Sequence, residues 1–145
     1  MTTNASHVAA LGRLLIALIF LFSGVGKILA PAGTEGYIAA AGLPAPLIAY
    51  LVAVVVEVGG GVLLVVGFQT RLAAIALAVF TVAAALGFHR DLADTNQLIH
   101  FLKNIAMTGG LLQVAAFGAG AFSIDGRHTA SAGTAGVGHG LAARG

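Results

Sequence analysis

Few side chains in this sequence could do chemistry, and most of those lie inside or beside long apolar runs. The predicted polar core consists of five of them: Arg13, Lys27, Glu57, Lys103 and Asn104. A charge at the centre of a bilayer costs about 2.5–3.5 kcal/mol on insertion scales, so such groups pair, face a bundle interior or reach toward the interface. By helical rise, Arg13 is the cation closest in depth to Glu57. We therefore expect Glu57 to be ionised and paired mainly with Arg13.

A second set of side chains could donate hydrogen bonds to a ligand within the membrane. These candidate contacts are Ser23, His89, Gln97, His100, Lys103 and Asn104. A quinone needs an apolar slot with one or two donors at its carbonyl oxygens, and His100, Lys103 and Asn104 could supply them. A structural hydrogen-bond network is the alternative interpretation of the same side chains.

The residues that most redox centres need are missing from the sequence. It has no cysteine, which excludes thiolate chemistry, iron–sulfur ligation and the c-type haem attachment motif. No pair of histidines has i,i+4 spacing and no pair of acids supports a di-metal site, so we expect neither a metal nor haem. A quinone remains the one cofactor that we consider.

Composition indicates that lipid surrounds most of this chain. Hydrophobic residues make up 59% of the 145 residues and charged residues only 8%, whereas soluble domains carry about 25% charged residues. The seven Lys and Arg residues are spread singly, so nucleic-acid binding is not expected. A spanning helix needs about 20 apolar residues. Four stretches qualify: 8–29, 46–68, 72–88 and 98–117.

These four stretches predict an all-α integral membrane four-helix bundle. Prolines and glycines between residues 31 and 46 separate the first two spans, with a short interfacial helix expected at 36–41. The first span is too long for the apolar region of a cleaved signal peptide. With an even number of spans, the slight excess of Arg on the side of the termini predicts an N-in/C-in orientation. We expect residues 1–125 to form this domain and the Gly/Ala-rich tail 126–145 to be disordered.

Several short motifs occur in an order and spacing that together are specific. They are Arg13-Leu14, Phe22-Ser23-Gly24-Val25-Gly26-Lys27, Gly42-Leu43-Pro44, Glu57-Val58-Gly59-Gly60 with Gly67, Thr70-Arg71 and Phe101-Leu102-Lys103-Asn104. In these motifs the sequence resembles the DoxX family of small bacterial membrane proteins over about residues 11–125. The resemblance implies a four-helix membrane bundle in the bacterial cytoplasmic membrane. It also implies that Arg13, Lys27, Glu57, Lys103 and Asn104 form a polar core, with no catalytic role for any of them.

Three functions are compatible with these features. Similar proteins include small subunits of a thiosulfate:quinone oxidoreductase and membrane partners of redox or detoxifying enzymes. By this analogy, the first hypothesis is a membrane subunit or anchor of a quinone-linked redox complex, not catalytic alone and without a redox centre of its own. The alternatives are a small-solute carrier or channel that works as an oligomer, and a structural or assembly subunit. The expected partners are the lipid bilayer and either a membrane-associated redox protein or a second copy of the chain.

Overall fold

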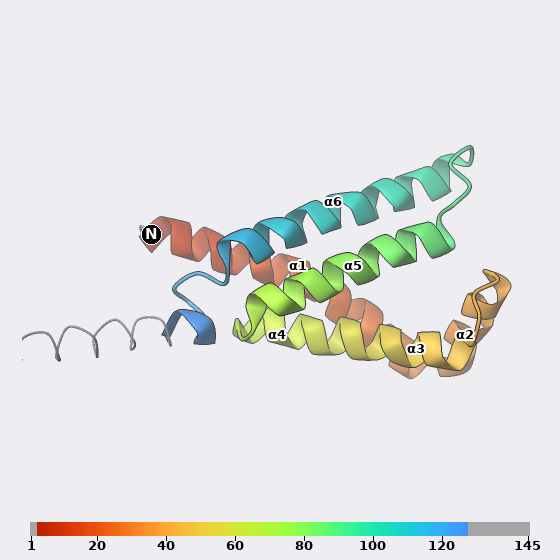
Figure 1. Ribbon diagram of the computed structural model, residues 1–145, viewed down its shortest axis with the longest axis horizontal. Helices are drawn as coiled ribbons and strands as arrows, with labels where there is room; N and C mark the ends of the chain where they lie inside the picture. The colour runs from red at the N-terminus through yellow and green to blue at the C-terminus, as the bar shows by residue number, and fades with distance from the viewer. Residues whose placement is uncertain (1–2, 128–145) are drawn as a thin grey trace, which may run out of the picture.

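The computed structural model describes residues 3–127, and these form helices joined by short turns (Figure 1). The elements are α1 (Thr3–Leu29), α2 (Pro31–Ala40), α3 (Pro46–Val54), the π-helical turn η1 (Val55–Gly59), α4 (Gly60–Val66), α5 (Thr70–Phe88) and α6 (Thr95–Phe117). No strand occurs in this part of the chain. Of the predicted tail 126–145, residues 128–145 lie outside the described residues.

Local sequence signals explain where several of these helices begin and end. Pro31 and Pro46 each occupy the first turn of a helix, where the missing N–H of proline costs no hydrogen bond. The side chain of Asp94 caps α6 by accepting a hydrogen bond from the backbone N–H of Gln97 at 2.8 Å. Gly67 ends α4 with φ +67°, a left-handed conformation that favours glycine.

Three segments of the described chain are long and apolar enough to cross a membrane: Asn4–Leu29, Pro46–Val66 and Thr70–Phe88. They correspond to the first three predicted spans. The fourth predicted span also forms a helix, α6, of 23 residues. It falls short in apolarity because its first half contains polar residues such as Lys103 and Asn104. The four-span count therefore stays a prediction.

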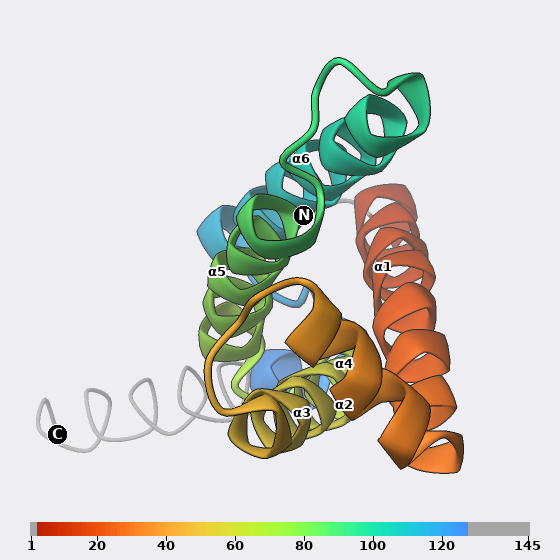
Figure 2. The same cartoon turned by 90° about the vertical axis from the view of Figure 1, so that its right-hand side faces the viewer.

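The helices pack as two layers that lipid must surround. Helix α1 lies along α3, η1 and α4, while α5 and α6 form an antiparallel pair in which α5 packs against α4 and α6 against α1 (Figures 1 and 2). The core between the layers is built from small and aliphatic residues that include Ala17, Ala74, Leu64 and Leu77. Large apolar side chains point outward, and Phe22 is 79% exposed. Such a surface would be untenable in water but suits a hydrocarbon environment.

Candidate functional site

Glu57 lies at the one irregular turn inside the second spanning segment. Residues 55–59 adopt a π-helical turn between α3 and α4, and Glu57 is 5% exposed. π-Turns inside α-helices are rare and occur often at functional sites. This turn carries the only acid within the three candidate spans of the described chain, which marks it as the first place to look for chemistry.

Two side chains from α1 bind the Glu57 carboxylate. The Lys27 ammonium donates to Glu57 Oε2 at 2.7 Å and to Oε1 at 3.0 Å. The Ser23 hydroxyl donates to Oε1 at 3.1 Å and itself accepts from Lys27 Nζ at 2.7 Å. Ser23 and Lys27 are four residues apart and so lie on one face of α1. We call Ser23, Lys27 and Glu57 the ion-pair cluster.

Glycine on α1 allows the two helices to come close enough for this cluster. A Cβ at Gly24 would lie 2.6 Å from Val58 Cγ2, closer than real Cβ contacts come, and a tight 3.2 Å from Glu57 Cβ. Further along the interface, a Cβ at Gly61 would lie 2.8 Å from Leu21 Cδ2. Small residues on α1 and on the η1–α4 segment therefore let the two helices approach closely.

The structure corrects the expected partner of Glu57, which is Lys27 and not Arg13. Arg13 is buried, and its guanidinium donates to the backbone carbonyls of Ala119 and Phe122 instead. It lies beside Gly67, where a Cβ would be 2.9 Å from Nη1. Ten residues separate Glu57 from Gly67, or roughly 15 Å along the helix axis. Helical rise alone placed Arg13 too close in depth to Glu57, because it does not give the register of α1 against the antiparallel segment α3–η1–α4.

Lys103 and Asn104 do not join the ion-pair cluster. Lys103 is exposed on α6 and makes no hydrogen bond or ion pair with any residue that the structure describes. Asn104 is half-buried, and its backbone carbonyl accepts a hydrogen bond from Thr108 Oγ1 at 2.9 Å. The five residues of the predicted polar core are therefore found in three places and not in one.

A separate polar group forms where the α5–α6 hairpin turns. The rings of His89 and His100 stack with centroids 5.1 Å apart, and His89 Nδ1 lies 2.9 Å from Gln97 Oε1. Tyr37 and Phe88 stack beside this hairpin, also at 5.1 Å. Three of the predicted ligand contacts, His89, Gln97 and His100, thus come together, whereas Ser23 belongs to the ion-pair cluster. Among residues 3–127, no three His, Asp or Glu side chains are grouped closely enough to hold a metal ion.

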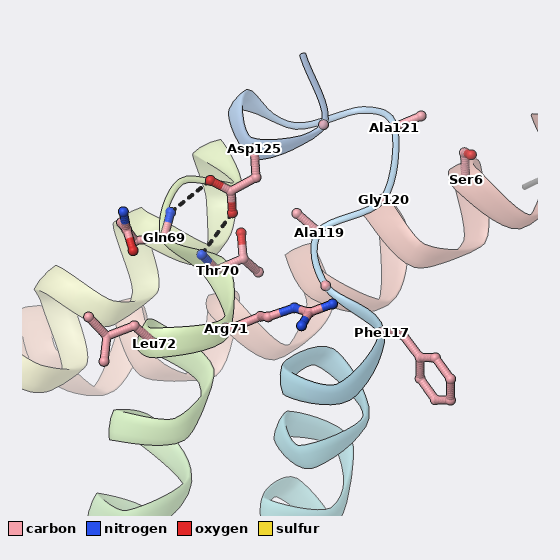
Figure 3. Close-up of a pocket in the computed structure, with 12 residues that line it drawn as sticks. Ser6, Gln69, Thr70, Arg71, Leu72, Phe117, Ala119, Gly120, Ala121 and Asp125 are labelled. Carbon is pink, nitrogen blue, oxygen red and sulfur yellow. Dashed lines mark hydrogen bonds between the residues drawn. The ribbon is translucent and has the colours of Figure 1, made fainter. Parts of the chain in front are cut away.

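Sequence reasoning missed the segment that follows α6. Residues 118–127 fold back across the end of the bundle opposite the α5–α6 hairpin turn. There the Asp125 carboxylate accepts hydrogen bonds from the backbone N–H groups of Gln69 at 3.0 Å and Thr70 at 2.9 Å, which cap α5 (Figure 3). The signal in the sequence was a lone acid, Asp125, that follows two glycines, Gly118 and Gly120. Both glycines have positive φ in the structure.

Comparison with known proteins gives one consistent result. A family model described as DoxX matches residues 8–90. Inner membrane protein YqjF of Escherichia coli (strain K12) is 38% identical over 113 residues, which cover 78% of this chain and 85% of that protein. Inner membrane protein YphA of the same organism is 37% identical over 123 residues, covering 81% and 87% respectively. No solved structure matches this chain.

Proposed function

Since this chain belongs to the DoxX family, we propose that it is a membrane subunit or anchor of a quinone-linked redox complex, without a redox centre of its own. Its location follows from two observations that agree. Two relatives that are more than a third identical over the aligned residues are inner membrane proteins, and three segments of this chain are apolar and long enough to span a bilayer. The chain is therefore a multi-pass protein of the inner membrane.

We infer that α6 is a fourth span and that both termini lie in the cytoplasm. Its 23 residues extend roughly 34 Å, enough for a hydrocarbon core of about 30 Å. It packs along α5, which is itself a candidate span. The first turn of α5, which contains Arg71, and the segment after α6, which contains Arg127, lie at the end of the bundle that holds the N-terminal end of α1 (Figure 1), and this supports a cytoplasmic position for that end.

The proposal that the chain works as a subunit rests on the exposed side chain of Lys103. Its side chain is exposed on α6, roughly 12 Å from the start of the helix by helical rise, and is unpaired within residues 3–127. Gly110 follows Lys103 by two turns on the same face of α6 and packs against α1. A Cβ at Gly110 would lie 3.1 Å from Ile16 Cδ1. A charged side chain facing lipid at this depth is costly, and a partner that supplies an acceptor removes that cost.

The polar group at the hairpin turn supports the quinone part of the proposal. His100 is exposed and precedes Lys103 by three residues, so both donors lie on neighbouring positions of one helix face. The Tyr37–Phe88 pair supplies aromatic surface near the same end of the bundle. An apolar setting with few donors is the kind of site that a quinone headgroup needs. The electrons would come from a cofactor held by the partner.

Purification from native membranes in mild detergent tests this function. We expect wild-type protein to retain a cofactor-bearing enzyme together with quinone, and Lys103→Leu to lose the enzyme while remaining folded. Leu102→Met, at the same depth, is the matched control and should retain it. Recovery of the chain alone would contradict the proposal. A retained complex without a redox cofactor would indicate the assembly role, and solute flux in vesicles would indicate the carrier role.

A further inference from the structure

A cleft lies at the end of the bundle where α5 begins and α6 ends (Figure 3). Its volume is about 590 Å³, and its walls come from the first turn of α5, the segment 117–121 and Asp125. Neither the ion-pair cluster nor the hairpin-turn group contributes to it. Its chemistry is therefore independent of the proposed redox role.

Arg71 gives this cleft a positive charge that forms no ion pair within the described chain, and Asp125 adds a negative charge to the same cleft. Its side chain is exposed, and no hydrogen bond or ion pair to it occurs among residues 3–127. The guanidinium extends across the cleft toward Gly118, where a Cβ would lie 3.6 Å from Arg71 Nε (Figure 3). The Asp125 carboxylate accepts from the N–H groups of Gln69 and Thr70, so its oxygens face the start of α5.

Thr70 adds a second, independent sign of a ligand. The residue is fully buried in the wall of the cleft, and its hydroxyl has no hydrogen-bond partner. Figure 3 shows this hydroxyl on the side of the cleft where Asp125 lies. A buried hydroxyl without a partner is costly, so a ligand oxygen that reached it through a small shift of the cleft wall would be favoured. An anion with several acceptor oxygens would satisfy the guanidinium of Arg71.

An apolar groove continues from the cleft along the surface between α1 and α6. Its volume is about 530 Å³, and its lining includes Ala5, Ala9, Gly12 and Val114. Phe117 and Gly118 line both the cleft and the groove, so the two hollows adjoin. Phe117 is 70% exposed at their junction. A ligand that fills both must have a charged head and an apolar tail.

We propose that the cleft and groove together hold one phospholipid, with its phosphodiester on Arg71 and an acyl chain between α1 and α6. The first turn of α5 marks the end of a candidate span and the last turn of α6 the end of the inferred fourth span, which is where headgroups would lie. Arginine binds phosphate oxygens through two parallel N–H groups, which gives the headgroup a fixed position. A free phosphate would use the cleft but leave the groove empty.

Native mass spectrometry of the full chain in mild detergent tests this site. We expect wild-type protein to retain one phospholipid and Arg71→Gln to need a roughly tenfold higher concentration of added lipid for the same occupancy. Arg127→Gln makes the same change of charge at the same end without touching either hollow, so it should behave as wild type. Equal retention by Arg71→Gln and wild type would overturn the proposal.

Two further arms separate a lipid from a free anion. Ala5→Phe should fill the groove and lower lipid retention, whereas Ala106→Phe, on the exposed face of α6 outside the groove, should not. Inorganic phosphate at millimolar concentration should fail to displace the lipid. Displacement by phosphate, or unchanged retention in Ala5→Phe, would assign the cleft to a small anion and contradict the lipid. Thermal unfolding of each variant shows that it is folded.

Discussion

At the residue scale, the Glu57 carboxylate is satisfied by side chains of its own chain. It accepts three hydrogen bonds, two from Lys27 and one from Ser23, at a point where water is scarce. Lys27 in turn uses its three N–H groups on Glu57 and Ser23. An acid held in this way ties two helices together, so we interpret the cluster as a structural clamp and not as a proton-transfer group.

Ser23→Ala tests the role of the hydroxyl in that clamp. The variant removes a donor to Glu57 and an acceptor for Lys27, and we expect it to lower the free energy of unfolding by about 1 kcal/mol. Thr108→Ala is the comparison, because that hydroxyl bonds only to the Asn104 carbonyl of its own helix and should matter less. Thermal unfolding in detergent micelles measures both. Equal stabilities of Ser23→Ala and wild type would contradict the clamp.

At the scale of the elements, the position of the clamp depends on one close helix contact. Gly24→Ala would place a methyl group against Val58, and we expect a loss of about 1–3 kcal/mol in stability from the forced separation. Gly26→Ala, two residues away, meets nothing within 4 Å. It should be neutral or stabilising by about 0.5–1 kcal/mol, since alanine favours a helix more than glycine does. Unfolding in micelles measures the difference, and equal effects would argue against the contact.

The cap on α5 gives a second prediction about elements. Asp125→Ala removes the carboxylate that accepts from Gln69 and Thr70, and we expect it to cost about 1 kcal/mol, as other N-cap losses do. Protease sensitivity near the α4–α5 turn should rise in parallel. Glu35→Gln removes an acid from α2 that forms no ion pair among the described residues, so it serves as the control. A stable Asp125→Ala variant with an unchanged cleavage pattern would show that the segment after α6 does not hold α5.

The sequence was sufficient for the helices and insufficient for their register. Runs of about 20 apolar residues predicted the positions of the long helices correctly, and Pro46 marked the start of the second run. The π-turn at 55–59 has no sequence signature that distinguishes it from a continuous helix. The partner of Glu57 depends on how far α1 slides past its neighbour, which is set by packing contacts such as Gly24 against Val58. Composition says nothing about that displacement.

At the scale of the whole molecule, the number of spans decides the orientation of every loop. The chain has no cysteine, so a single introduced thiol reports one position without background. With four spans, Ala93→Cys between α5 and α6 should react with a membrane-impermeant reagent in intact cells. Ala121→Cys, after α6, should react only once the cells are lysed. Labelling of both positions from the same side would show that α6 does not cross the membrane.

The charges that remain after the clamp has formed determine what this molecule can bind. Glu57 and Lys27 neutralise each other, and Arg13 is held by backbone carbonyls. Lys103 near one end and Arg71 at the other stay exposed without partners in the described chain. We assign the first to a protein partner and the second to a phospholipid. The stability of the bundle should therefore depend on Glu57, and its associations on Lys103 and Arg71.

A double-mutant cycle tests most directly whether Lys27 is the cation that holds Glu57. The free energy of unfolding in micelles is measured for Lys27→Met, for Glu57→Gln and for the double variant. A parallel cycle uses Arg13→Gln with Glu57→Gln. We predict a coupling of about 1–3 kcal/mol between Lys27 and Glu57, and additive effects within about 0.5 kcal/mol for Arg13 and Glu57. Strong coupling of Glu57 to Arg13, with none to Lys27, would contradict this account.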